Sequence, residues 1–430
     1  LDALTNGDWN TAIGYWALSA NTSGTYNTAS GGKALYHNTT GDKNTANGYY
    51  ALYSNTTGDY NTASGYAALY ANSTGYNNAA YGYETLKVNT TGTNNTAIGL
   101  QALWANTTGS ANTATGSGAL VKNTTGNYNT ASGYNALTAN TTGTRNIAIG
   151  YGAYDGADQE SDNLAIGYNA LGGAISGGEK NVAIGNYSMD ANTSGDYNTA
   201  VGYASLGANT NNSNNTAIGY QSLLNTASGG FNTGVGSRSL ESNASGINNT
   251  AVGANSIFTN SSGDENTGVG RNSLYATTGS YNTSLGWYSG NEITSGTYNT
   301  VIGHNASASG ATAVNQTVIG AGATGTTDNT VLLGNGSITN WLPTDDNEVD
   351  LGSSSKEMKN VYVDGVTYTD AVGFGTVVMT LPTADGSADQ VLKTDGSGAL
   401  SWTDAGGGAA TKIDDLSDAK SGGDNFTGSL

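Results

Sequence analysis

The sequence contains no cysteine, and only two prolines and two histidines among its 430 residues. Without cysteine there are no disulfide bonds and no thiolate metal sites, which suits an oxidising exterior as well as a cytosol. No stretch approaches the roughly 20 apolar residues of a membrane-spanning helix. Lys and Arg number 13 against 32 Asp and Glu, a formal net charge of -19. Because no basic run occurs, we predict no nucleic-acid partner and no membrane insertion.

Groups that could carry catalysis are also scarce. His37 and His304 are the two possible imidazole bases, and they lie far apart in the sequence. Neither adjoins a serine or cysteine nucleophile motif. We therefore predict that the protein is not an enzyme, with no catalytic residue, no cofactor-binding residue and no cofactor.

Carboxylates gather at two places, and clustered oxygens can bind calcium. Their spacing does not match the twelve-residue calcium loop, and an exposed acidic loop is commonly just solvated. Metal binding is therefore left open, and no ligand is assigned. The two clusters are Asp155, Asp158, Glu160 and Asp162, and Asp345, Asp346, Glu348 and Asp350.

The abundant feature of the sequence is a repeat. A tetrad Asn-Thr-Ala-x, closed by Gly, returns with a 17-residue period from Gly14 to Gly167 without a slip. After one 18-residue step and a later 16-residue step, the series reaches Gly320, and a last 14-residue step ends at Gly334, which makes 20 copies. With such a period each unit stacks only on its neighbours, so we expect an elongated solenoid and not a globule with one pocket.

The repeat unit favours strands and turns over helix. Frequent Gly, Asn, Thr and Ser would cost a helix several tenths to about 1 kcal/mol per position relative to Ala. Asn-Thr-Thr-Gly, as at 106–109, indicates one corner, where Asn bonds its own backbone and Gly accepts a positive φ. A second corner is expected near the motif Gly. Each coil would then hold two short extended pieces and two turns.

A leucine column in phase with the glycines requires an interior. In register, Leu would lie over Leu and Asn over Asn at the strand spacing of about 4.8 Å. We predict an all-β fold: a parallel β-solenoid, or β-roll, of about twenty 17-residue coils over residues 1–340. The column comprises Leu18, Leu35, Leu52, Leu69, Leu86, Leu103, Leu120 and Leu137.

The residue before the motif Gly changes character along the chain. If this column faced solvent, its later part would be an apolar stripe that demands a partner. A thin roll also buries little apolar area per coil, so we predict that the stripe faces further copies of the chain in a homotrimer. The early members include Ser30, Asn47, Ser64, Thr115 and Ser132, and the later ones are Val201, Ile218, Val235, Val252, Val269, Leu285, Ile302 and Ile319.

Tyrosine recurs in two further columns. Stacked tyrosines would stiffen the roll by roughly 0.2 to 1 kcal/mol per pair. The alternative is a stripe that faces carbohydrate or another partner, since Tyr has an apolar face and a polar tip. Asn-x-Thr/Ser triplets match glycosylation acceptors, but this composition produces them by chance and through turns. One column follows the motif Gly (Tyr15, Tyr49, Tyr66, Tyr83, Tyr134, Tyr151, Tyr168, Tyr203, Tyr220), and the other precedes the motif Asn (Tyr26, Tyr60, Tyr128, Tyr197, Tyr281, Tyr298).

The motif Asn-Thr-Ala-Ile-Gly at 10–14, 95–99 and 215–219, with Asn-Val-Ala-Ile-Gly at 181–185, resembles the repeat of trimeric autotransporter adhesin heads. The resemblance covers roughly residues 1–340. It implies a left-handed parallel β-roll in which three chains lie about a threefold axis. The family's usual 14-residue unit has the length of the last step here, from Gly320 to Gly334, so the 17-residue unit departs from it by three.

The last 90 residues differ in character. The phrases Asp-Leu-Gly-Ser-Ser-Ser-Lys at 350–356 and Gln-Val-Leu-Lys-Thr-Asp-Gly at 390–396 resemble phrases of bacteriophage tail fibres, which are also trimers. We predict an adaptor at 341–370 and a β-rich module at 371–430. Its strands are expected at 375–381, 390–393 and 399–403, with a hairpin turn at 395–398 and a short helix within 411–420. The chain ends at Leu430 within a Gly-rich phrase, and we treat it as a fragment.

These patterns predict a structural and adhesive fibre. The first expectation is the shaft of a phage tail fibre, extracellular on the virion, that contacts other virion proteins and a host surface glycan or receptor. One alternative is a trimeric adhesin on the bacterial cell surface. The other, from a different class, is a glycan-degrading tailspike enzyme, for which paired carboxylates in a groove would be the sign.

Overall fold

The computed structural model describes residues 6–156, 158–173, 176–338, 371–374, 377–380, 382, 387, 390–397 and 399–404. These residues contain strands, turns and bends, and no helix among them is long and apolar enough to cross a membrane. The chain divides into two compact units, Leu1–Asn340 and Trp341–Leu430. The adaptor predicted at 341–370 and the helix predicted within 411–420 lie outside the described residues.

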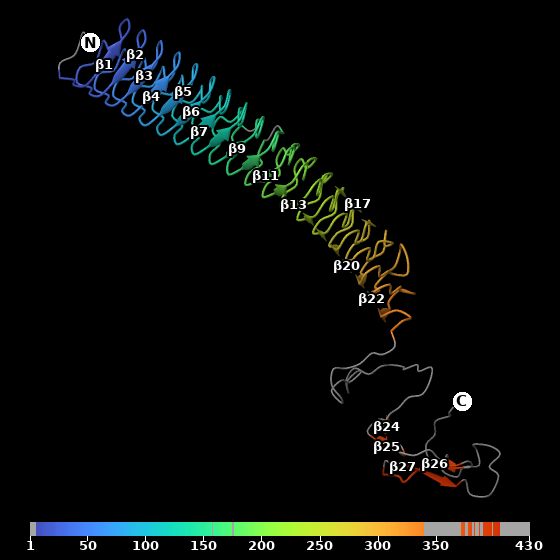
Figure 1. Ribbon diagram of the computed structural model, residues 1–430. Coiled ribbons are helices and arrows are strands. Elements are labelled where there is room, and N and C mark those ends of the chain that lie inside the picture. Colours follow the sequence, from blue (N-terminus) through green and yellow to red (C-terminus); the bar gives the residue numbers. More distant parts are fainter. Residues whose placement is uncertain are drawn as a thin grey trace. The chain divides into compact units, whose positions relative to one another are not determined.

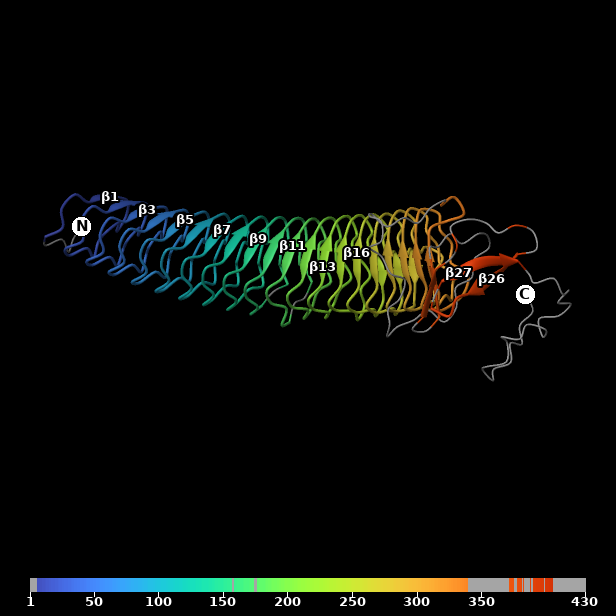
Figure 2. The ribbon, with the colours of Figure 1, turned by 90° about the horizontal axis from the view of Figure 1, so that it is seen from below.

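The first unit is a parallel β-solenoid (Figure 1), which confirms the predicted fold class. Each coil contributes one three-residue strand to a 20-stranded sheet, and Figure 2 shows these strands side by side along one face. The strands are β1 (Thr11–Ile13), β2 (Thr28–Ser30), β3 (Thr45–Asn47), β4 (Thr62–Ser64), β5 (Ala79–Tyr81), β6 (Thr96–Ile98), β7 (Thr113–Thr115), β8 (Thr130–Ser132), β9 (Ile147–Ile149), β10 (Leu164–Ile166), β11 (Val182–Ile184), β12 (Thr199–Val201), β13 (Thr216–Ile218), β14 (Thr233–Val235), β16 (Thr250–Val252), β18 (Thr267–Val269), β20 (Thr283–Leu285), β21 (Thr300–Ile302), β22 (Thr317–Ile319) and β23 (Val331–Leu333).

The register of this sheet follows the glycine count of the sequence. Ala97 pairs with Ala114 in the next coil, and the same residue types face each other along most of the sheet. The irregular steps fall where the sequence places them, between β10 and β11, between β18 and β20, and between β22 and β23. An inserted or missing residue is therefore absorbed in the turns, and the strands stay aligned.

Two apolar columns build the interior. The middle residue of a strand, such as Ala97, and the predicted leucine column, such as Leu103, are fully buried. Thr96 and Ile98 flank Ala97 and point outward, as the alternation of a strand requires. Tyr154, Met189 and Ile257 occupy the leucine position, fully buried, in coils without leucine there. The core is thus thin and continuous along the solenoid.

The second extended piece of each coil is seldom a strand. In the described part of the solenoid it forms a second, three-stranded parallel sheet only at β15 (Ser242–Asn243), β17 (Thr259–Asn260) and β19 (Ala276–Thr277). In most coils the prediction of two extended pieces was therefore wrong. Between the motif glycine and this piece the backbone is left-handed: Leu103 has φ 51 and Gln101 has φ 55, and equivalent residues repeat these values. Two such residues in alternation turn the chain continuously where an extended strand would run straight.

The glycines of the two corners serve different purposes. The motif glycine Gly99 has φ 133, as expected of a corner that only glycine adopts readily. The turn glycine Gly109 lies outside the left-handed region, so the positive φ predicted there was wrong. A Cβ at Gly109 would lie 2.5 Å from the carbonyl oxygen of Gly126 and closer still to Asn106 Oδ1. Close approach of the next coil, and not backbone conformation, requires glycine at this corner.

Two columns of buried asparagine tie the coils together. In the motif column, the backbone N–H of Asn95 donates to Asn78 Oδ1 at 3.0 Å, and Asn95 Nδ2 donates to the carbonyl oxygen of Gly109 at 2.8 Å. In the turn column, Asn106 Nδ2 donates to Asn89 Oδ1 at 2.7 Å and to the Gly109 carbonyl at 2.9 Å. The predicted asparagine ladders therefore exist, and they satisfy buried backbone groups at the corner.

Two antiparallel hairpins are described in the second unit. They pair β24 (Ala371–Phe374) with β25 (Val377–Thr380), and β26 (Gln390–Thr394) with β27 (Leu400–Asp404). The hairpin predicted at 395–398 is confirmed: Gly396 has φ 81, and Asp395 Oδ1 accepts from the N–H groups of Ser397 and Ala399. β24 was not predicted, because we began the expected strand at Gly375.

Candidate functional site

The two histidines lie in separate surroundings. The ring of His37 is nearly perpendicular to those of Tyr36 and Tyr53, with centroids 4.6 and 4.9 Å away. His304 stacks on Trp287 at 4.7 Å, many coils further along the solenoid. Each histidine is part of an aromatic stack, and the structure does not bring the two together.

The carboxylates of the acidic cluster at 155–162 do not converge on one site, and Glu160 and Asp162 contact different partners. Glu160 occupies a turn-glycine position, and its carboxylate accepts from the N–H groups of Asp158, Gln159 and Gly177 at 2.8 to 3.1 Å. Asp162 pairs with Arg145, 2.8 Å from Arg145 Nη2 to Asp162 Oδ2. Among the described residues, no group of three or more His, Asp or Glu could hold a metal ion. The second cluster, Asp345 to Asp350, lies outside them.

Tyr154 marks this coil as a local departure from the repeat. It replaces a core leucine, and its hydroxyl accepts from Asn163 Nδ2 at 2.5 Å. Burial raises the pKa of the Tyr154 hydroxyl well above its usual range, so the group stays neutral. The sequence signal for this contact was present, since tyrosine interrupts the leucine column where the turn motif is also lost.

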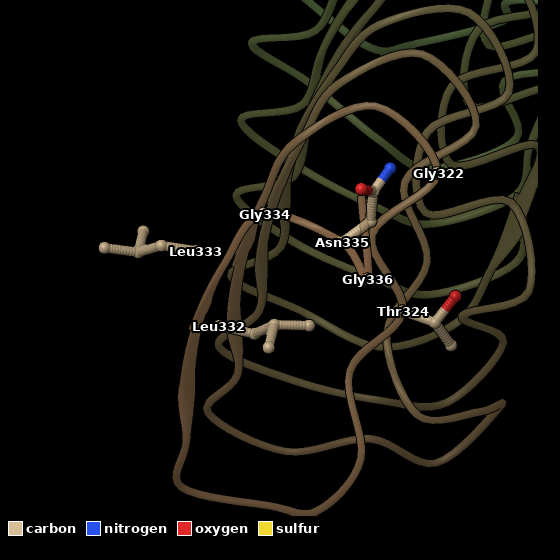
Figure 3. Close-up of a pocket in the computed structure, with 7 residues that line it drawn as sticks. All are labelled: Gly322, Thr324, Leu332, Leu333, Gly334, Asn335 and Gly336. Atoms are coloured by element: carbon tan, nitrogen blue, oxygen red, sulfur yellow. The ribbon is translucent and has the colours of Figure 1, made fainter. Parts of the chain in front are cut away.

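A hollow of about 520 Å³ lies at the last coil of the solenoid (Figure 3). Its lining is Gly322, Thr324, Leu332, Leu333, Gly334, Asn335 and Gly336, which includes no titratable side chain. Figure 3 shows Leu332 directed into the coil and Leu333 directed away from it. The hollow lies at the end of the core, where the final step, from Gly320 to Gly334, is the shortest of the series.

The outer face of the long sheet carries the predicted stripe. Ile218 is 40% exposed and Leu285 is 47% exposed, although both are large apolar side chains. The neighbouring outward column is threonine from Thr199 to Thr317, so this face has no charged residue over eight coils. The column therefore points outward, as the prediction of a partner requires.

The tyrosines stack along the solenoid as ladders. Tyr49, Tyr66 and Tyr83, which we call the Tyr66 ladder, stack at 6.1 and 5.2 Å. Tyr134, Tyr151 and Tyr168 form a similar ladder at 5.1 and 5.2 Å. The tyrosines that precede the motif Asn also take part: Lys43 lies 4.7 Å above Tyr60, and Tyr281 stacks on Tyr298 at 4.8 Å.

One further tyrosine ladder, in a different column of the coil, was not predicted from the sequence. Tyr36, Tyr53 and Tyr70, the Tyr53 ladder, follow the leucine column and stack at 5.4 and 5.1 Å with nearly parallel rings. Tyr50 stands between the two ladders, at 87° to Tyr53 and 67° to Tyr49. The signal was a third tyrosine column with the same period as the repeat. It spans only three coils, which made it easy to overlook.

The acceptor triplets for glycosylation fall into two groups. In Asn106-Thr107-Thr108 the asparagine is fully buried, and its Nδ2 already donates two hydrogen bonds. Such asparagines cannot receive a glycan while the coil is folded. Asn94, in Asn94-Asn95-Thr96, lies instead in the exposed column before the motif.

Among the described residues, three carboxyl groups have raised pKa values: those of Asp155, Asp190 and Glu292. Burial is the main cause in each case, because it disfavours the charged form. Glu292 accepts from the N–H of Ala308 and from Ser307 Oγ, which partly offsets the rise. A folded state with a raised carboxyl pKa binds its proton more tightly, so its stability falls as the pH rises through that pKa.

We expect Glu292→Gln to stabilise the solenoid near pH 7 and to have little effect below about pH 4, where the unfolded glutamate is also protonated. Thermal unfolding of both proteins at each pH measures the difference. The pKa values of Asp162 and Glu84 are lowered by Arg145 and Lys87, but both proteins contain these carboxylates. Their contribution to the pH dependence therefore cancels in the difference. Exposed Glu265→Gln is the matched control, and an equal gain in both variants would contradict the assignment to Glu292.

The fold defines the class: this is an all-β repeat protein, a parallel β-solenoid whose coils stack in register. No protein-family model matches the chain, and neither does any curated protein. A β-solenoid of this kind is compatible with a structural role in a fibre or an adhesin.

Proposed function

We propose that the protein is a structural and adhesive fibre, the shaft of a phage tail fibre that contributes to host attachment outside the cell. The main observation that supports this proposal is the uninterrupted register of the 20-stranded sheet. Hydrogen bonds between successive coils run along the solenoid, as from Leu103 N–H to the Ala119 carbonyl oxygen at 3.0 Å. This construction gives length and stiffness. A net charge of -19 opposes clumping of such fibres.

The uncharged stripe supports a parallel homotrimer. A partner that covers it needs a matching apolar column of the same length and coil spacing, and another copy of this chain carries one. Such an interface closes on itself about a rotation axis. The phrases at 350–356 and 390–396 favour the tail fibre over the bacterial surface adhesin, since they resemble tail-fibre sequences.

We expect light scattering to give three times the 43.3 kDa mass of one chain. Val235→Ser, Val252→Ser and Val269→Ser together should lower that mass, because they break the stripe with the residue found at Ser30, Ser64 and Ser132 in the same column. Ser245→Ala with Ser262→Ala, at exposed turn positions of neighbouring coils, is the control. A single-chain mass for the unchanged protein would refute the trimer.

Adhesion is tested by incubating the purified protein with bacterial cells and with their isolated surface polysaccharide. Binding without cleavage supports the proposal. Release of sugar would overturn the non-enzymatic part and favour a tailspike enzyme. Trimers that bind no cells would leave a spacer shaft without adhesion of its own.

A further inference from the structure

The repeat does not require the aromatic residues that crowd its first coils. After Tyr70 the column of the Tyr53 ladder holds Lys87, Trp104, Val121 and Thr138, and the coils there keep the same strands and the same buried leucine. After Tyr50 its column holds Ala67, Glu84, Gln101 and Gly118. The concentration of tyrosine over residues 36–83 is therefore dispensable for folding, and a surface of this kind marks an interaction.

The ladders present ring edges and hydroxyl groups, not ring faces. Within the Tyr53 ladder the planes of successive rings differ by 5°, so Tyr36 and Tyr70 cover the two faces of the middle ring, Tyr53. In the Tyr66 ladder Tyr49, Tyr66 and Tyr83 stay 44 to 49% exposed. The edge of an aromatic ring carries partial positive charge, and a phenol hydroxyl both donates and accepts. Two parallel rows of such groups attract oxygen atoms.

Tyr50 and Lys33 connect the rows. Tyr50 stands across both ladders, and Lys33 Nζ lies 5.2 Å from its ring centroid and 3.3 Å from its hydroxyl oxygen. Lys33 Nζ also lies 5.4 Å from the ring of Trp16, which is 45% exposed. A fixed positive charge between the rows adds to the attraction for electron-rich oxygen.

We infer that the Tyr53 and Tyr66 ladders together bind an extended neutral polysaccharide along the solenoid, an inference that rests on the proposed adhesive function and names its ligand class. The ladder repeats at 5.1 to 5.4 Å, comparable with the length of one sugar ring, so successive sugars meet the same groups in successive coils. The net charge of -19 disfavours a polyanion. A protein partner would need a central anchoring contact, whereas this surface is periodic.

Affinity electrophoresis of the full chain in gels that contain mannan, dextran, galactomannan or anionic alginate tests the inference. At least one neutral polymer is expected to retard the protein. Tyr36→Thr, Tyr53→Thr and Tyr70→Thr together should weaken that binding about tenfold or more, because they remove one row of hydroxyls and ring edges. The matched control, Tyr134→Ser, Tyr151→Ser and Tyr168→Ser, removes a ladder outside the two-ladder surface and should bind as before.

Retardation by no polymer, retardation by alginate alone, or equal loss in both triple variants would each overturn the inference. Circular dichroism and light scattering confirm that the variants keep fold and mass. A folded, assembled Tyr53-ladder variant that still binds cells and polysaccharide as the unchanged protein does would refute this surface and leave the fibre proposal intact. An unchanged protein that binds no cells at all would instead count against the adhesive function.

Discussion

Gly99→Ala is expected to destabilise the solenoid by about 3 kcal/mol or more, because two unfavourable terms add. Gly99 has φ 133, a conformation that alanine adopts only with strain. A Cβ there would also lie 2.5 Å from the carbonyl oxygen of Gly116, a backbone atom held by the next coil. Each coil is stabilised by its contacts with the two adjacent coils, so the loss of stability should extend to coils on both sides of the substitution.

Substitutions at two further glycines separate the cost of the unfavourable φ from the cost of the close contact. Gly109→Ala brings only the close approach to Asn106 and Gly126, without an unfavourable φ, and should cost less than Gly99→Ala. Gly336→Ala meets no atom within 4 Å and should be neutral. Denaturant unfolding measures the order, and hydrogen exchange locates the loosened coils. Equal effects of all three substitutions would contradict the explanation.

Asn89→Ala is expected to cost about 3 kcal/mol, since several buried groups lose their partners at once. Asn89 Nδ2 donates to Asn72 Oδ1 at 2.8 Å and to the Gly92 carbonyl at 3.0 Å, and Asn89 Oδ1 accepts from Asn106 Nδ2 at 2.7 Å. The exposed amide of Asn94 gives the control, because Asn94→Ala leaves no buried group unpaired. Thermal and denaturant unfolding provide the readout.

Asn89→Asp sharpens this test. A carboxylate there would face two acceptors, Asn72 Oδ1 and the Gly92 carbonyl, and would be buried without a counter-charge. The loss should be greatest at neutral pH and shrink in acid, where the protonated carboxyl donates one hydrogen bond. A pH-independent loss would argue that the ladder amide does not work as a donor.

The chain itself contains interrupted ladders. Asn140 Oδ1 and Asn209 Oδ1 are buried without a partner. One period further on, the sequence has Ala157 and Thr226, neither of which offers an amide. The fold thus tolerates a single buried oxygen that has no hydrogen-bond donor, because the many intact coils supply most of the stability.

Much of the fold could be predicted because a period fixes neighbours. The 17-residue spacing predicted that Ala97 lies beside Ala114 and Leu103 above the next leucine, and the register confirms the pairing of Ala97 with Ala114. It located the corners and the outward stripe through Ile218 and Leu285. These are consequences of position in the coil, which counting residues reveals.

The sequence by itself therefore determined the class of fold, the number and phase of its coils, the inward leucine column and the outward column before the motif glycine. Only the tertiary structure decided how each column is used: the left-handed φ of Leu103, the reason for glycine at Gly109, the separate contacts of Glu160 and Asp162, and the rings of the Tyr53 ladder stacked with their faces covered. The physical reason is that a period specifies which residues meet. Their dihedral angles, hydrogen-bond partners and ring orientations are set by the hydrogen bonds and close contacts between one coil and the next.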